Sequence, residues 1–192
     1  AVAPWLERGL TPQVAFEFEF YLQRPDGEGG WTPIHTPSSR VYGTGTAVDP
    51  DGIVAEIAAR AVDADMDVEA WCTEFDDTQF EVNIKYTQAL RAADDAFLFR
   101  VLAHEVATER GHRATFIGRP YAERGGSGLH VNISFVDESG TNVLFDPDAD
   151  GLEVPDPYYG GRVEERSLVP LGAARLGRAG FDEWLRRSRA AA

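Results

Sequence analysis

The sequence has a single cysteine, Cys72, among 192 residues. One thiol cannot form an intramolecular disulfide, and it excludes zinc sites built from several cysteine thiolates. Within the segment VEAWCTEF, we interpret Cys72 as a small buried side chain rather than as a nucleophile. Because a reducing compartment suits a chain without a disulfide framework, we expect a cytoplasmic protein.

Basic residues are also scarce, since 18 Lys and Arg stand against 32 Asp and Glu and give a formal net charge of −14. This charge repels a phosphate backbone and an anionic membrane surface, so we expect neither nucleic acid nor a membrane as a partner. No apolar run approaches the roughly 18 residues needed to span a bilayer. The acidity is compatible with binding cations or polyamines, although a solvated acidic surface explains it without any ligand.

Hydrophobic residues are not scarce, because they make up 43% of the chain. A chain of this length buries roughly 70% of its unfolded surface, so a folded domain with a core is expected.

Two glutamates interrupt an otherwise aromatic segment, VAFEFEFYL, at residues 14–22. Alternation places Phe16, Phe18 and Phe20 on one face of a strand and Glu17 and Glu19 on the other. The segment therefore predicts a strand with an apolar back and an acidic front.

Similar patterns predict the remaining elements. The Gly, Pro, Ser and Asp content of residues 24–52 is typical of a long surface loop. Helices are predicted at 53–66 and 87–111, and further strands at 67–75, 79–86, 113–118 and 129–136. For the long helix we expect Thr87 as the N-cap, and a buried face made of Leu90, Ala93, Phe97 and Val101.

Polar side chains recur on one face of four of these segments. They are Glu17 and Glu19, Glu74, Glu81, and His130 with Asn132. The fold class expected is α+β, a curved and mainly antiparallel sheet with helices on its apolar back. Carboxylates gathered on the front would repel one another unless they were protonated or bound metal, and their hard oxygens with one imidazole suit Mg²⁺ or Mn²⁺. An ordinary solvent-exposed sheet face is the alternative for any single strand.

Three quoted segments carry a resemblance to the glutamine synthetase family. VAFEFEFYL resembles its Gly-x-Glu-x-Glu-Phe strand with Ala15 in place of glycine, and EFDDTQFEVNI is similar to its Glu-x4-Gln-x-Glu element. GGSGLHVNISF is similar to Gly-Ser-Gly-x-His-x-His, with Asn132 at the second histidine. A helix and strand between them also match, with Arg119 for the lysine of Lys-Pro. These replacements indicate the relatives that glutamylate polyamines or other amines.

The resemblance implies a set of site residues. Glu19, Glu74 and Glu81 would surround one divalent cation, Mg²⁺ or Mn²⁺, and Glu17 with His130 would hold a second. Gly126 would touch the glutamate substrate, while Asn132 and Ser134 would lie against the nucleotide of ATP. No catalytic side chain is assigned.

The implied activity is an ATP-dependent ligase that joins the γ-carboxylate of glutamate to ammonia or an amine through γ-glutamyl phosphate. Positioning and metal charge would supply most of the rate enhancement. Two alternatives stay open at this point: a pseudoenzyme that binds metal and nucleotide without turnover, and an inactive truncated gene product. Family subunits assemble into rings, so the resemblance also implies a homo-oligomer.

We expect two regions, a partial catalytic domain at 1–145 and a divergent C-terminal tail at 146–192. Nothing before Val14 is expected to form the small β-rich domain with which family subunits begin. The tail is rich in Gly, Ala, Arg and Pro, which is what an alternative reading frame of GC-rich DNA would encode. A natural short protein with its own C-terminal helix is the other interpretation.

Overall fold

The computed structural model describes residues 2–34, 41–76 and 78–144. The expected tail at 146–192 lies outside these residues. The described elements are α1 (Ala3–Leu6), β1 (Thr11–Pro25), β2 (Trp31–Pro33), α2 (Ile53–Asp63), β3 (Val68–Thr73), β4 (Gln79–Gln88), α3 (Ala89–Glu109), β5 (Arg113–Thr115) and β6 (Leu129–Val136). Within the described ranges, no helix combines the length and apolar character that crossing a membrane requires.

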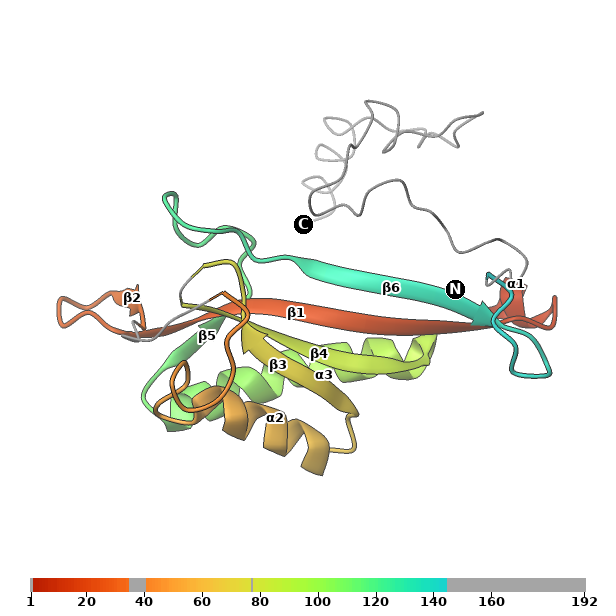
Figure 1. Cartoon of the computed structure of the whole chain (residues 1–192), viewed down its shortest axis with the longest axis horizontal. Helices are drawn as coiled ribbons and strands as arrows, with labels where there is room; N and C mark the ends of the chain where they lie inside the picture. Colours follow the sequence, from red (N-terminus) through yellow and green to blue (C-terminus); the bar gives the residue numbers. More distant parts are fainter. Residues whose placement is uncertain (1, 35–40, 77, 145–192) are drawn as a thin grey trace, which may run out of the picture. The chain divides into compact units, whose positions relative to one another are not determined.

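The strands form one antiparallel sheet built around β1. This strand pairs with β4 along one side and with β6 along the other, and β3 continues the sheet beyond β4. The short strands β2 and β5 pair with the C-terminal end of β1. Figure 1 shows α2 and α3 lying together on one side of this sheet. The predicted fold class, a mainly antiparallel sheet with helices on one face, is confirmed.

The apolar back of β1 forms the centre of the core. Phe18 and Phe20 are almost completely buried, and they belong to one cluster with Ile57 of α2 and Phe99 of α3. The Phe18 and Phe99 ring centroids are 4.7 Å apart. Burying one such side chain contributes about 1.5–3 kcal/mol, so the alternation along β1 is what fixes the sheet against the helices.

The prediction for the long helix was wrong in its start and in its buried face. Thr87 lies in β4 and Gln88 is the N-cap of α3. Phe97 and Leu90 are 69% and 62% exposed, whereas Phe99 is fully buried. Both sets of apolar residues recur with the helical period, so the period alone cannot select the face. The packing of Phe18 against Phe99 makes that selection.

The predicted loop at 24–52 was partly wrong as well. β1 extends to Pro25, and residues 31–33 return as β2 to pair with it. The hairpin turn between them is held by Asp26, whose carboxylate accepts hydrogen bonds from the backbone N–H groups of Glu28 and Gly30. The content of glycine and proline therefore predicted a loop at a place where the chain forms a short hairpin.

Asp49 fixes the start of α2. Its two carboxylate oxygens accept hydrogen bonds from the backbone N–H groups of Ile53 and Ala55, at 2.9 Å each. We expect Asp49→Ala to lower the free energy of unfolding by about 1–2 kcal/mol, because two N–H groups of the first helical turn lose their acceptor. Urea unfolding measures this loss. The exposed neighbour provides the control, since Asp51→Ala removes a carboxylate of the same charge; equal losses in the two variants would contradict the capping role.

Candidate metal and substrate site

The register of the sheet brings the predicted polar residues onto one face. Glu19 lies opposite Glu81 of β4, and Glu17 lies opposite His130 of β6. Paired residues of neighbouring strands project to the same face. Glu17, Glu19, Glu81 and His130 therefore gather on the front of the sheet, away from the buried phenylalanines.

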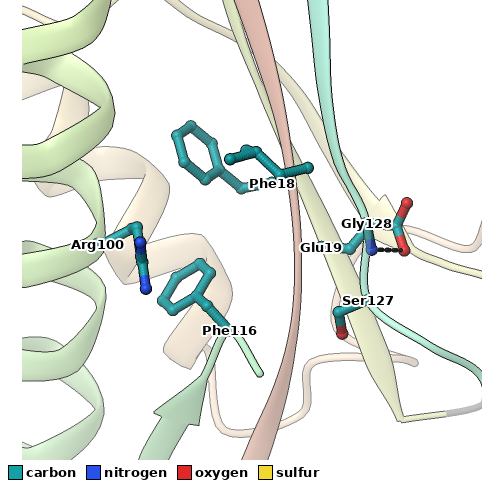
Figure 2. A pocket seen from close by; sticks show the side chains of 7 residues that line it. Phe18, Glu19, Arg100, Phe116, Ser127 and Gly128 are labelled. Atoms are coloured by element: carbon teal, nitrogen blue, oxygen red, sulfur yellow. Dashed lines mark hydrogen bonds between the residues drawn. The ribbon is translucent and has the colours of Figure 1, made fainter. Parts of the chain in front are cut away.

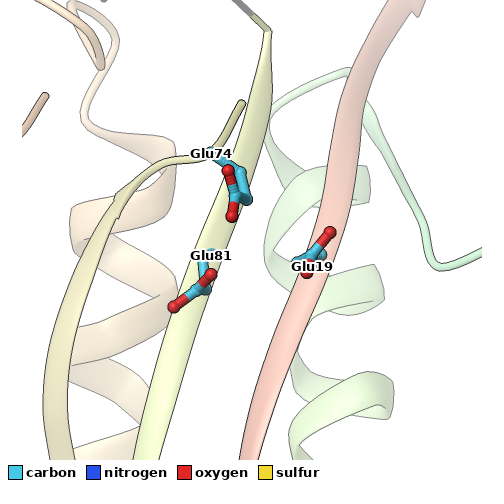
Figure 3. A group of neighbouring side chains, drawn as sticks. All are labelled: Glu19, Glu74 and Glu81. Carbon is cyan, nitrogen blue, oxygen red and sulfur yellow. The ribbon is translucent and has the colours of Figure 1, made fainter. Parts of the chain in front are cut away.

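Three glutamates form a compact cluster on this front face. One carboxylate oxygen from each of Glu19, Glu74 and Glu81 lies within 4.8 Å of the other two. Figure 3 shows Glu19 on β1 facing Glu74 and Glu81, and Glu81 lies on β4. Glu19 and Glu74 are only 7% and 8% exposed. Such a spacing matches the set of three residues expected to surround the first cation.

The electrostatics of the cluster favour an added positive charge. Burial is the main cause that raises the pKa of Glu74, and the charges of Glu19 and Glu81 raise it further. Burial likewise raises the pKa of Glu81. Among the described residues, the buried Oε2 of Glu74 has no hydrogen-bond partner. All the possible metal ligands of this cluster are carboxylate oxygens, and one of them has no hydrogen-bond partner in the described part of the chain. Such a set fits a hard cation such as Mg²⁺ or Mn²⁺.

The second predicted pair lies beside the first cluster. The Nδ1 atom of His130 is 2.9 Å from Oε2 of Glu17 and 3.7 Å from Oε1 of Glu19. Neighbouring ligands of an octahedral ion with bonds of about 2.1 Å are roughly 3 Å apart, so Glu17 and His130 could bind one ion together. The amide of Asn132 donates a hydrogen bond of 2.8 Å to the other oxygen of Glu17. Asn132 thus holds the carboxylate, a contact that the sequence did not indicate.

The glycine-rich turn before β6 borders the same cluster. Gly128 donates its backbone N–H to Oε2 of Glu19 at 2.8 Å, as Figure 2 shows. The carbonyl of Gly126 accepts a hydrogen bond from the side chain of Gln79. The turn therefore lies within hydrogen-bonding distance of the carboxylate cluster, while Ser134 lies further along β6 opposite Gln13.

Two residues of this site escaped the sequence-based prediction. Gln79 is 1% exposed and contacts both Glu19 and the turn. Its place in the Glu-x4-Gln-x-Glu element was visible, but a buried amide gives no signal of its partners. Tyr21 also binds the turn, since its hydroxyl donates to the carbonyl of Gly125 at 2.7 Å.

Cys72 is paired with Glu81 in the register of β3 and β4 and is partly buried. Burial, followed by the charges of Glu81 and Glu74, raises the pKa of its thiol to about 11. Because the thiolate is the nucleophilic form, a protonated thiol agrees with the interpretation that Cys72 is inert.

Comparison with known proteins decides the family of this chain. Residues 1–166 match the family model for the glutamine synthetase catalytic domain. The chain belongs to the glutamine synthetase family. The resemblance carried by the motifs around Glu17, Glu81 and His130 is thereby confirmed.

Individual members of the glutamine synthetase family match in sequence and in structure. The chain is 36% identical over 163 residues to glutamate–isopropylamine ligase from a Pseudomonas species, which covers 81% of this chain and 36% of that protein. It is 34% identical over 180 residues to γ-glutamylputrescine synthetase of Escherichia coli strain K12, covering 88% and 38%. The structure of GmaS without ligand aligns with a TM-score of 0.67 and 30% identity, covering 78% of this chain and 35% of that one. The chain thus spans a little more than one third of the length of these relatives.

Proposed function

We propose that the front of this sheet is the metal-binding and substrate-binding wall of an ATP-dependent ligase that joins the γ-carboxylate of glutamate to an amine or ammonia. The observation that carries the proposal is the cluster of Glu19, Glu74 and Glu81. The pair formed by Glu17 and His130 lies directly beside it. Two adjacent groups of carboxylates, one of them with an imidazole, suit a pair of cations that bind a substrate with several phosphates.

The proposed reaction has two steps. First, the γ-carboxylate oxygen of glutamate attacks the terminal phosphorus of ATP, giving γ-glutamyl phosphate and ADP. Second, the amine nitrogen attacks the acyl carbon, phosphate leaves, and the nitrogen loses a proton to give the amide. Two bound divalent cations, Mg²⁺ or Mn²⁺, would offset the negative charge of the phosphates during the transfer.

The residues of this chain have binding and orienting roles in the proposal. Glu19, Glu74 and Glu81 would hold one cation, and Glu17 with His130 the other. Gly126 would contact glutamate, and Asn132 with Ser134 would lie against the nucleotide. A structure of the relative GmaS in complex with ADP supports a nucleotide substrate. The names of two relatives, which specify isopropylamine and putrescine, favour an amine over ammonia as the acceptor.

A phosphate-release assay tests this function. Release from ATP with Mg²⁺ is expected to depend on both glutamate and an amine, with isopropylamine and putrescine tried beside ammonia. Phosphate release that does not depend on glutamate would contradict the ligase reaction. Mg²⁺-dependent ATP binding without any release would instead support the alternative of a metal- and nucleotide-binding module.

A further inference from the structure

Gln79 is an uncharged polar side chain that is buried beside the carboxylate cluster. It is 1% exposed, and it lies on β4 opposite Tyr21 of β1. Glu81 follows two residues later on the same strand, so both side chains project to the front face. A buried amide must find hydrogen-bond partners, and the partners of Gln79 define its role.

The amide nitrogen of Gln79 joins the cluster to the glycine-rich turn. It lies 2.8 Å from the carbonyl oxygen of Gly126, 3.0 Å from Oγ of Ser127 and 3.3 Å from Oε2 of Glu19. A side-chain amide has two N–H groups, so these three acceptors share two donors. One side chain therefore holds a carboxylate and two consecutive residues of the turn.

The same contacts set the direction of Glu19. Its Oε2 accepts from Gln79 and from the backbone N–H of Gly128. The other oxygen, Oε1, faces the second pair, 3.7 Å from Nδ1 of His130. The two donors thus occupy one oxygen of Glu19 and leave the other directed at the front of the sheet, where a cation would bind.

We propose that Gln79 is a positioning residue that couples the cation site to the glycine-rich turn. It aims Glu19 at the cation and fixes Gly126, so an ion bound to Glu19 orders the turn at residues 125–128. This coupling rests on the proposed binding of a divalent cation by Glu19, Glu74 and Glu81. It goes beyond that function because Gln79 is not among the residues proposed to bind the cation or the substrate.

The remaining anchors of the turn make the role of Gln79 separable from simple folding. The carbonyl of Gly125 accepts from Tyr21, and its N–H donates to Asp76. The N–H of Ser127 donates to the carbonyl of Gly118 at 2.8 Å. Because these bonds do not involve Gln79, the turn keeps its attachment when the amide is removed. What is lost is the contact of the amide with Gly126, Ser127 and Glu19, whereas Gly128 still donates its N–H to Glu19.

The test uses Gln79→Met, which keeps the length of the side chain and removes its donors without adding charge. Calorimetric titration with Mn²⁺ is expected to show an affinity about 10–100-fold weaker than in the wild type, the usual effect of losing an outer partner of a metal ligand. The matched control is Gln88→Met, at an exposed glutamine of the same strand. This control is expected to bind Mn²⁺ as the wild type does.

Hydrogen exchange provides a second measurement that a merely structural role would not move. In the wild type, saturating Mg²⁺ is expected to slow exchange of the amides at 126–128 and to leave those at 139–141 unchanged. In Gln79→Met this slowing is expected to disappear at 126 and 127 and to persist at 128, because Gly128 donates directly to Glu19. If the variant does not fold, the wild-type comparison at 126 and 127 tests the coupling, because these residues of the turn contact Gln79 rather than Glu19.

The outcomes separate this proposal from the proposed function. Unchanged Mn²⁺ affinity in folded Gln79→Met would overturn the positioning role while the cation site stands. If hydrogen exchange of the turn amides in the wild type did not change on adding Mg²⁺, the coupling would be overturned. A wild type that binds no Mn²⁺ would overturn both the cation site and this inference.

Discussion

Replacing Glu81 with glutamine is expected to make the metal-free protein more stable and, at the same time, to remove most of its affinity for Mn²⁺. Burial and the charges of Glu17 and Glu19 raise the pKa of Glu81, which means that the folded protein resists its ionisation. An amide of the same shape removes that unfavourable charge. It also removes a cation ligand, and we expect an affinity loss of more than about 100-fold, beyond the effect of losing an outer partner.

The pH dependence gives this prediction a sign. A carboxyl whose pKa is raised on folding contributes stability that is fully present below its ordinary value of 4.5 and is lost as the pH rises through the raised value. Glu81→Gln does not lose stability in this way, because its amide does not ionise. Its advantage in melting temperature, measured with EDTA, should therefore be absent below about pH 4.5 and grow towards neutral pH.

An exposed glutamate of β3 supplies the control, because Glu69→Gln removes the same charge outside the cluster. It is expected to change neither the metal-free melting temperature nor its rise on adding Mn²⁺. If Glu81→Gln instead lowered the metal-free stability at neutral pH, burial and repulsion would not make the charge of Glu81 unfavourable in the folded protein. A metal-induced rise that survived in Glu81→Gln would show that the ion binds elsewhere.

Adding one methyl group at Gly128 is expected to damage the site while sparing the fold. A Cβ atom there would lie 2.8 Å from Oε1 of Glu19 and 3.4 Å from Nε2 of His130. Both neighbours are ends of side chains, which can move at little cost to stability. The movement would displace a proposed ligand of each cation, so we expect Gly128→Ala to bind Mn²⁺ at least about tenfold more weakly, since misplaced ligands lose affinity.

The same substitution at Gly118 is the matched control. There the nearest atom to an added Cβ is the carbonyl oxygen of Ser127 at 3.8 Å, an ordinary van der Waals contact. Calorimetry should therefore show wild-type Mn²⁺ binding for Gly118→Ala. Equal losses for the two alanine variants would mean that general disturbance of the turn, rather than displacement of Glu19, weakens binding. Full binding by Gly128→Ala would contradict the placement of Glu19 as a ligand.

Alternation predicted the sheet well because strand geometry leaves little freedom. Side chains change face at every residue, so Phe18 could be buried only if Glu17 and Glu19 faced the front. Helix α3 offered no such constraint. Its exposed Phe97 and its buried Phe99 are both compatible with helical periodicity, and contact with β1 chose between them.

Sequence reasoning named the glutamates and the histidine that the sheet brings together, but it missed Gln79, Tyr21 and the hydrogen bonds that connect the site. Glu74 shows why, since it follows the last residue of β3 and alternation no longer governs it. Its position is set by a backbone hydrogen bond of 2.8 Å from its N–H to the carbonyl of Gln79. Bonds between segments distant in sequence, like those of Gln79 to the glycine-rich turn, arise only when the sheet has formed.

The pairing of β6 has a mechanical consequence. Apart from one bridge between Val136 and Asn142, the described residues pair β6 only with β1. Pulled from its end, such a strand would unzip one residue pair at a time. An ion gripped by Glu17 on one strand and His130 on the other would be a cross-link near the end where β6 begins. The force needed to peel this strand would then report whether the ion is bound.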